Sequence, residues 1–345
     1  MNKIAIVPKM HDTSYGSQFD INDIKCCIGN IKPKSLNISI IDMNAIYGID
    51  LSKYDAVLFI GLSDYAKSYI TTPPKNQKIF IWSNNHYDLV NNPSLFKNVD
   101  IRFEQSTNTF PRITGRGHVI YLTTAFQEYS YPLPTEPVKK EYDVVFSGGL
   151  NRTSRTIEPL YRVKVLQAIM DVGFTVVNYN ARPSSQREIE NRYLAQLSSY
   201  KTKFTHVDRW ANKEDLQTGK FVLNMPFPHL GVNADKNFAM TYFEKECSIW
   251  YHTWDIFRSI GADTNIITYA AEPINKLGVS DDQVHYYTKT PQDLQLMTDQ
   301  IIEIIKSGKV KKLLPSTIQS NSYTNRWGTI IKHIELYMPT KEFKK

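Results

Sequence analysis

Short, uninterrupted apolar runs recur along this chain and constrain its fold more than any other feature. The clearest is Ala56-Val57-Leu58-Phe59-Ile60, in which no polar side chain interrupts the apolar ones. Such a run is typical of a strand in a parallel sheet that helices cover on both faces. Comparable runs predict strands at residues 3–7, 37–42, 55–61, 77–83, 99–103 and 118–122. The pattern predicts a doubly wound α/β fold.

A proline-rich segment, residues 129–137, separates this pattern from a second one. Its prolines disfavour both a helix and a hydrogen-bonded strand, which is typical of a linker. The segments predicted beyond it are strands at 142–146, 175–179, 221–225, 265–269 and 283–287, and helices at about 156–172, 254–260 and 290–307. Because 345 residues exceed the usual size of one hydrophobic core, we expect two domains. They are predicted at 1–137, completed by a C-terminal helix within 320–345, and at 138–319.

The positive charge of the chain is concentrated near its end. The net charge is +7, and residues 306–345 hold nine Lys or Arg against two acids. This segment suits a polyanion such as DNA, and equally a solvated terminal helix. No apolar run reaches the roughly 20 residues of a membrane span, and residues 1–8 lack a signal-peptide pattern, so we expect a cytoplasmic protein. Cys26, Cys27 and Cys247 match no disulfide framework or metal motif.

A glycine-containing turn follows the strand predicted at 142–146. At the carboxyl edge of a parallel sheet, Gly148 and Gly149 would let backbone amides approach a phosphate. Arg152 and Arg155 add guanidinium groups that suit a diphosphate. The turn lacks the Gly-Lys-Ser/Thr ending of a Walker loop and the full Gly-x-Gly-x-x-Gly spacing. The alternative is an ordinary tight turn with two surface arginines.

A second segment, residues 255–269, predicts a short amphipathic helix, a turn and a buried strand. It places Asp255 and Arg258 one helical turn apart on the same face. A carboxylate there would suit sugar or ribose hydroxyls. The alternative is a salt bridge between the two side chains, worth about 0.3–0.5 kcal/mol if exposed.

Together, residues 143–158 and 255–269 resemble the C-terminal lobe of GT-B glycosyltransferases, which have two Rossmann-like domains facing a cleft. In detail they resemble the bacteriophage DNA β-glucosyltransferase family, which modifies 5-hydroxymethylcytosine in DNA. Shorter similarities lie at residues 3–6, 54–55, 78–82, 180–182 and 204–205. The resemblance implies an inverting transfer of glucose, or of a pentose such as arabinose, from a UDP-sugar to hydroxymethylated cytosine in double-stranded DNA. We expect a monomer, in the host-cell cytoplasm if the protein is phage-encoded.

The resemblance also implies roles for individual residues in donor binding. The diphosphate would be held by Gly148, Gly149, Arg152 and Arg155, although Arg155 matches only with a one-residue gap. Tyr179 would lie near the diphosphate.

The uracil would be held by backbone groups of His206 and Val207. Where the family has an Arg-x-x-Glu pair, this chain has Asp255 and Arg258 with the charges exchanged, so details of donor recognition are expected to differ.

The sequence indicates the catalytic base less clearly than the donor-binding residues. The position of the family's catalytic carboxylate corresponds to Asn85, whose amide cannot accept a proton. Two residues of the same loop, Asp88 and His86, are the candidates, with Asp88 preferred. The alternative is a polar loop in which Asp88 caps a helix. Asp20 is a reserve candidate.

Basic residues of the first domain are candidates for DNA contacts. These are Arg112, Arg116 and Lys75, with Lys67 and Lys78 as further phosphate contacts. Mg²⁺ or Mn²⁺ would suit the leaving diphosphate, but no acidic cluster identifies metal ligands, and Asp235 is the one weak hint.

Two alternatives stay open. One is a GT-B glycosyltransferase acting on a polysaccharide or a protein. The other is a non-catalytic relative that binds a nucleotide or DNA, and Asn85 is the feature that favours it.

Overall fold

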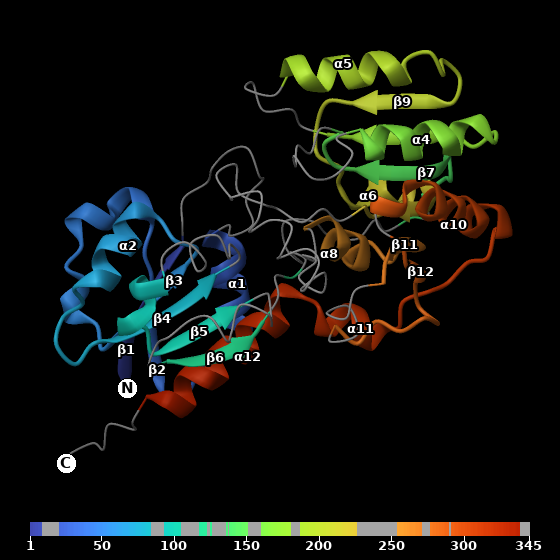
Figure 1. Cartoon of the computed structure of the whole chain (residues 1–345). Coiled ribbons are helices and arrows are strands. Elements are labelled where there is room, and N and C mark those ends of the chain that lie inside the picture. Colours follow the sequence, from blue (N-terminus) through green and yellow to red (C-terminus); the bar gives the residue numbers. More distant parts are fainter. Residues whose placement is uncertain are drawn as a thin grey trace. The chain divides into compact units, whose positions relative to one another are not determined.

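The computed structural model describes most of the chain (Figure 1). The described residues are 1–8, 21–83, 93–104, 117–122, 125, 136, 138–150, 160–180, 187–225, 254–270, 277–289 and 291–338. The chain divides into two compact units, Met1–Ser130 with Ser322–Lys345, and Tyr131–Asn321. Each unit contains one sheet of six strands.

The first unit is built on a parallel sheet with the strand order β2-β1-β3-β4-β5-β6. Its strands are β1 (Asn2–Pro8), β2 (Leu36–Ile40), β3 (Ala56–Ile60), β4 (Lys78–Ser83), β5 (Ile101–Glu104) and β6 (His118–Tyr121). All six were predicted from the apolar runs, with small differences at their ends. Every residue of β3 is buried, which confirms that this strand is covered on both faces.

Two hydrophobic clusters cover the two faces of this sheet. Leu58 and Trp82 belong to one cluster, together with residues of α1 and α12. Phe59 and Ile81 belong to the other, together with residues of α2 and the 3₁₀ turn η4. The helical elements of the unit are α1 (Ile21–Ile31), η2 (Met43–Gly48), η3 (Leu51–Lys53), α2 (Asp64–Thr71), η4 (Pro93–Asn98) and α12 (Tyr323–Tyr337).

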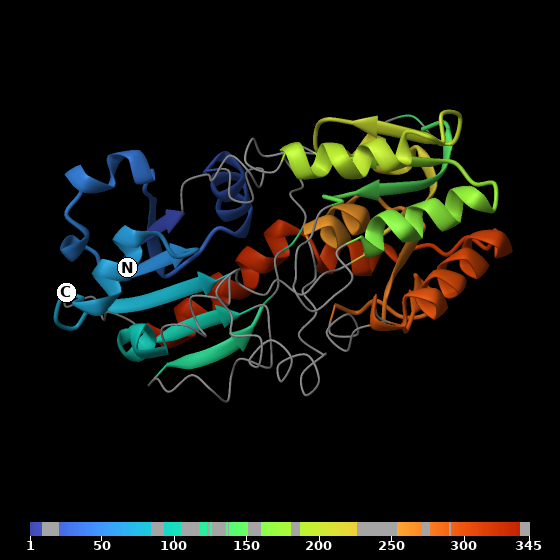
Figure 2. The same cartoon turned by 45° about the horizontal axis from the view of Figure 1, so that its top comes forward.

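The C-terminal helix α12 completes the first unit, and Figure 2 shows it running along the strands of the first sheet. Trp327 is fully buried, with its ring centroid 5.7 Å from that of Trp82. The hydroxyl of Tyr337 donates a hydrogen bond of 2.9 Å to Asp100, which precedes β5. The helix begins after Ser322, whose hydroxyl accepts from the amide of Asn325, and lies within the range 320–345 expected from the sequence.

The second unit is built on a parallel sheet with the strand order β12-β11-β10-β7-β8-β9. Its strands are β7 (Tyr142–Ser147), β8 (Val176–Tyr179), β9 (Phe204–Val207), β10 (Gly219–Leu223), β11 (Ile266–Tyr269) and β12 (His285–Tyr287). The chain moves outward from β7 to β8 and β9, then returns to place β10 on the other side of β7. The order therefore reverses between β7 and β10, and ligands of open α/β sheets bind outside the carboxyl ends of strands at such a point.

Helices cover both faces of the second sheet. Residues of α4 and α10 belong to the larger cluster, with Val144 and Phe146. Residues of α6 and Ala262, just past α8, belong to the other cluster, with Val145 and Val177. The helices are α4 (Tyr161–Asp171), α5 (Arg187–Leu197), α6 (Lys213–Gln217), α8 (Trp254–Gly261), α10 (Leu294–Ser307), which follows the 3₁₀ turn η7 (Pro291–Asp293), and α11 (Pro315–Ser320).

Three expectations for this unit need correction. The helix expected from about residue 156 begins at Tyr161, because Leu160 has a turn backbone (φ −99°, ψ 9°). The strand expected at 221–225 is β10, two residues earlier, which leaves Met225 beyond its carboxyl end. Strand β9 was not predicted, because its two apolar residues, Phe204 and Val207, are separated by Thr205 and His206 and no residue of the strand is fully buried.

Candidate functional site

The turn after β7 lies at the carboxyl end of the strand where the sheet order reverses. Gly148 has a φ of 153°, a value that residues with a side chain rarely adopt. Its amide donates a hydrogen bond of 2.9 Å to the carbonyl of Tyr179 at the end of β8. The expected glycine-dependent turn is therefore present at the expected edge of the sheet.

Asn178 holds this turn from the neighbouring strand. It is fully buried, and its amide nitrogen donates to the carbonyls of Phe146 (3.2 Å) and Gly148 (3.0 Å). In a trans peptide the carbonyl and the following N–H point in opposite directions. Because the Gly148 carbonyl is directed at Asn178, the amide of Gly149 is directed away from it. Asn178 therefore fixes the orientation of the peptide between Gly148 and Gly149.

Two further buried side chains hold the next peptide of the turn. Arg162 on α4 donates to the carbonyl of Gly149 (2.6 Å) and to that of Met225 beyond β10 (2.5 Å). Glu190 on α5 accepts the amide of Leu150 at 3.2 Å. A hydrogen bond to a charged group is worth about 1.5–3 kcal/mol, so this turn is strongly preorganised.

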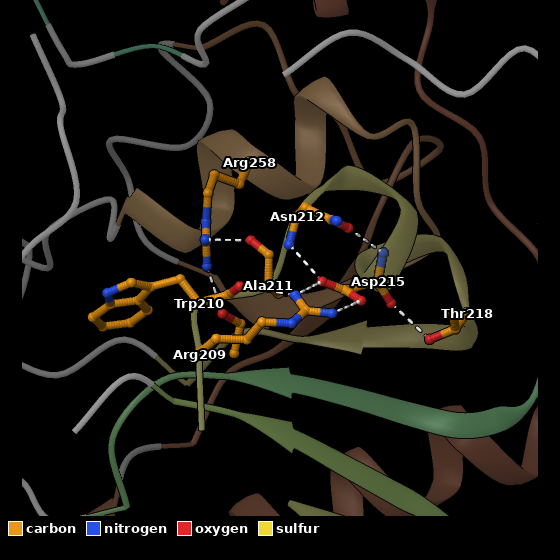
Figure 3. Close-up of polar contacts among 8 residues, drawn as sticks. Arg209, Trp210, Ala211, Asn212, Asp215, Thr218 and Arg258 are labelled. Carbon is orange, nitrogen blue, oxygen red and sulfur yellow. Dashed lines mark hydrogen bonds and ion pairs between the residues drawn. The ribbon is translucent and has the colours of Figure 1, made fainter. Parts of the chain in front are cut away.

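Arg258 reaches the site from α8, as Figure 3 shows. Its side chain is buried, and its two terminal nitrogens donate to the hydroxyl of Ser147 (2.5 Å) and to the carbonyl of Ala211 (2.6 Å). The guanidinium also lies 5.9 Å from the ring centroid of Trp210. Arg258 therefore connects the end of β7 with the loop after β9.

The last two residues of β9, His206 and Val207, were expected to hold a uracil. The carbonyl of Val207 accepts two amide hydrogens, from Asn180 (3.1 Å) and Arg209 (2.9 Å). Since a carbonyl oxygen has two lone pairs, its accepting capacity is already used. Nδ1 of His206 lies 3.0 Å from the side-chain oxygen of Asn178, so His206 belongs to the same network as the glycine turn.

An ion pair between the exposed Arg209 and the largely buried Asp215 holds the loop after β9 (Figure 3). The guanidinium of Arg209 donates to both carboxylate oxygens of Asp215, which also forms a capping box with Asn212. Burial acts to raise the pKa of Asp215, but hydrogen bonds from Arg209 and from the Asn212 backbone outweigh it and lower the pKa below its ordinary value.

Tyr179 lies beside this ion pair. Its ring centroid is 5.3 Å from the Arg209 guanidinium. Burial, with the nearby Asp215 carboxylate, raises the pKa of Tyr179 to about 12, so the phenol is neutral at physiological pH.

Some of the residues expected in the site come together in the structure. Gly148, Gly149 and Tyr179 lie at the ends of β7 and β8, and His206, Val207 and Arg258 lie around the end of β9. Others are outside the described residues, so the structure places none of them: Asp20, Asn85, His86, Asp88, Arg112, Arg116, Arg152, Arg155 and Asp235. Asp255 belongs to α8, but its side chain is not described.

The basic residues expected to contact DNA are placed in part. Lys75 is exposed and precedes β4, at the amino ends of the strands, away from the carboxyl edge. Lys78 pairs with Asp100 at 3.1 Å and lies 5.2 Å from the ring of Tyr337, so it has a structural partner. Lys67 lies on α2.

The sequence indicated no role for Asn178, Arg162, Glu190 or the Arg209–Asp215 pair. A weak signal was available for Asn178, because it is the single polar residue in the apolar run 176–179. A buried polar side chain requires hydrogen-bond partners. Which groups provide them depends on the neighbouring strands, which the run itself does not contain.

Within the described ranges, no group of three or more His, Cys, Asp or Glu side chains could hold a metal ion. The helices in the same ranges are all too short or too polar to cross a bilayer.

Comparisons with known proteins identify the fold. No protein-family model matches the chain, and no curated protein matches its sequence. Among solved structures, sucrose-phosphate synthase from Thermosynechococcus elongatus is similar with a TM-score of 0.63 and 9% identity, over 98% of this chain and 100% of that one. HepE from Anabaena, in complex with UDP-glucose, gives a TM-score of 0.58 and 10% identity, over 98% and 100%.

A third neighbour is AviGT4, a glycosyltransferase involved in avilamycin A biosynthesis, with a TM-score of 0.52 and 11% identity over 96% of this chain and 98% of that one. At such low identity the similarity shows the fold alone. The chain has the GT-B fold of glycosyltransferases, as expected. The comparisons do not confirm the narrower resemblance to bacteriophage DNA β-glucosyltransferases.

Proposed function

We propose that this protein is a glycosyltransferase that takes its sugar from a nucleoside diphosphate sugar bound to the second unit. The observation that carries the proposal is the preorganised turn at Gly148 and Gly149, held by Asn178 and Arg162 where the strand order reverses. Open α/β sheets bind ligands at this place, and the backbone amides of a glycine turn suit a phosphate. That the neighbour HepE was solved with UDP-glucose supports a UDP-sugar as the donor.

In this proposal the donor lies along the ends of β7, β8 and β9. The amide of Gly149 meets the diphosphate, with Arg152 and Arg155 as additional cations. Because the Val207 carbonyl is already used, the uracil takes its hydrogen bonds from other backbone groups of residues 206–211. Asp255 is the candidate for the ribose or sugar hydroxyls.

The reaction proposed is an inverting displacement. The acceptor hydroxyl oxygen forms a bond to the anomeric carbon while the bond from that carbon to the diphosphate oxygen breaks. The hydroxyl proton passes to a general base, for which Asp88 and His86 are the candidates, and UDP leaves with the bonding electron pair. Mg²⁺ or Mn²⁺ would suit the leaving group.

For the acceptor we propose hydroxymethylated cytosine in double-stranded DNA. This rests on the sequence resemblance and on the net charge of +7, which favours a polyanion. A base inside a duplex must leave the stack to reach an active site, so basic residues such as Arg112 and Arg116 would contact the flanking phosphates.

The first experiment measures donor binding by calorimetry with UDP. Gly148→Ala forces an unfavourable backbone conformation on the turn and should weaken UDP binding about tenfold or more, the effect of losing one charged hydrogen bond. The matched control is Gly29→Ala on α1 of the first unit, where a Cβ meets no atom within 4 Å and UDP affinity should not change. Absence of UDP binding by the unaltered protein would refute the proposal.

The second experiment tests transfer. The protein is incubated with a panel of UDP-sugars and with duplex DNA that contains or lacks 5-hydroxymethylcytosine, and the nucleosides are analysed by mass spectrometry. A sugar-sized mass gain on the modified base alone supports the DNA acceptor. Transfer to a polysaccharide or protein in a parallel panel would replace that acceptor, and UDP binding without any transfer would indicate a non-catalytic relative.

The base is tested in the same assay. Loss of turnover in Asp88→Asn with UDP affinity retained supports Asp88, and full turnover in that variant would exclude it. His86→Gln tests the second candidate in the same way.

A further inference from the structure

Arg258 connects two parts of the proposed donor site that belong to different strands. Ser147 ends β7, and Ala211 lies in the loop after β9, with β8 between these strands in the sheet. One guanidinium, buried and supplied by α8, donates to both of them. This side chain therefore links the β7 turn directly to the 208–212 loop.

The surroundings of Arg258 favour this connecting role over direct contact with a ligand. Its terminal nitrogens are each directed at a protein acceptor, at 2.5 and 2.6 Å, and only 7% of the residue is exposed. The Trp210 ring lies beside the guanidinium, 5.9 Å away, in the same loop as Ala211. A planar guanidinium with a fixed fork of donors suits two acceptors at a set distance from each other.

We propose that Arg258 is a positioning residue of the donor site, which holds the turn after β7 and the loop after β9 at the spacing that the donor requires. The inference rests on the proposed function and deepens it, since it gives Arg258 a role other than binding the donor. A donor that spans both loops would bind well only while their spacing is fixed. Flexible loops would have to be ordered on binding, at a cost in affinity.

Substitutions at two residues, Arg258 and Ser147, separate positioning from ligand contact. Arg258→Lys keeps the charge, but an ammonium on a flexible stem cannot reproduce the fork that serves both acceptors. Ser147→Ala removes one of the two acceptors and leaves Arg258 in place, and Ser147→Thr keeps the hydroxyl. The matched control is Arg192→Lys on α5, an exposed arginine paired with Glu188 in the next turn of the same helix.

The first measurement is UDP affinity by calorimetry. We expect Arg258→Lys to weaken binding about tenfold, Ser147→Ala to weaken it by a smaller factor, Ser147→Thr to weaken it less than Ser147→Ala, and Arg192→Lys to leave it unchanged. If Arg258 acts through Ser147, the double variant that combines Arg258→Lys with Ser147→Ala should bind UDP no more weakly than Arg258→Lys alone. Fully additive losses would overturn the proposal and indicate direct contact between Arg258 and the donor.

The second measurement is amide hydrogen exchange without any ligand. Exchange in residues 208–212 should be faster in Arg258→Lys than in the unaltered protein, and unchanged in Arg192→Lys. Unchanged exchange in Arg258→Lys would overturn the inference. The exchange measurement needs no nucleotide. If the unaltered protein fails to bind UDP, the proposed function is refuted, but the exchange measurement still decides whether Arg258 holds the loop.

Discussion

Replacing Asn178 with Leu should both destabilise the second unit and weaken donor binding. Leu has a similar shape but neither donates nor accepts a hydrogen bond. In the protein, the Asn178 side chain is fully buried and serves three partners: the carbonyls of Phe146 and Gly148, and the ring nitrogen of His206. The substitution would leave these groups without their present partner, at two buried carbonyls and one partly buried ring nitrogen.

The magnitude follows from the number of groups affected. A buried polar group left unsatisfied costs about 1–3 kcal/mol. With three groups, and with one of the bonds as long as 3.2 Å, the low end of that range predicts a loss of about 3 kcal/mol in the free energy of unfolding. For a unit of this size, 3 kcal/mol corresponds to a decrease of about 6–12 °C in the melting temperature. UDP affinity should fall about tenfold or more, because the peptide between Gly148 and Gly149 is no longer held.

Urea unfolding monitored by circular dichroism measures the first effect, and calorimetry with UDP measures the second. The control is Gln196→Leu on α5, which exchanges an exposed amide for the same apolar side chain and should change stability by less than about 0.5 kcal/mol. A loss below about 1 kcal/mol for Asn178→Leu would refute the reasoning, since it would be less than the cost of a single unsatisfied group. Lost stability with unchanged UDP affinity would mean that Asn178 supports the fold and not the turn's binding conformation.

Two further predictions concern the two units separately. Trp327→Ala removes a fully buried ring that contacts Trp82 and Tyr323, and it should lower the free energy of unfolding of the first unit by about 3–5 kcal/mol, measured with urea. The control is Leu336→Ala on the same helix. Because Leu336 is 75% exposed, this variant should lose less than about 0.5 kcal/mol. Similar losses in both variants would contradict the packing of α12 in the core. The pKa of Asp215 in the folded protein is lowered from its ordinary value of 3.8. The stabilisation from its ion pair is therefore fully present above pH 3.8 and is lost as the pH falls through the lower pKa of the folded protein. Acid titration should therefore show Asp215→Asn to be less stable than the unaltered protein near neutral pH, with a gap that narrows below about pH 4; a constant gap would contradict it.

The class of the fold could be predicted from the amino-acid sequence. Runs such as residues 56–60 must be buried on both faces, and two series of such runs separated by a proline-rich segment imply two parallel sheets. The turn at Gly148 was also predictable, because a glycine between a buried strand and a helix has few other uses. These conclusions depend only on local composition and spacing, and the structure bears them out.

The tertiary structure alone decided how the site is held together. From the sequence, Arg258 was expected to face Asp255 or a ligand, but its guanidinium is directed at Ser147 and Ala211, which are 111 and 47 positions away in the chain. Asn178 likewise serves groups on β7 and β9 that only the strand order brings beside it. The physical reason is that a buried polar side chain must find partners, and the partners available depend on which strands are neighbours and in which register. Periodicity indicates that a residue is buried, but only the packed sheet determines which groups it meets.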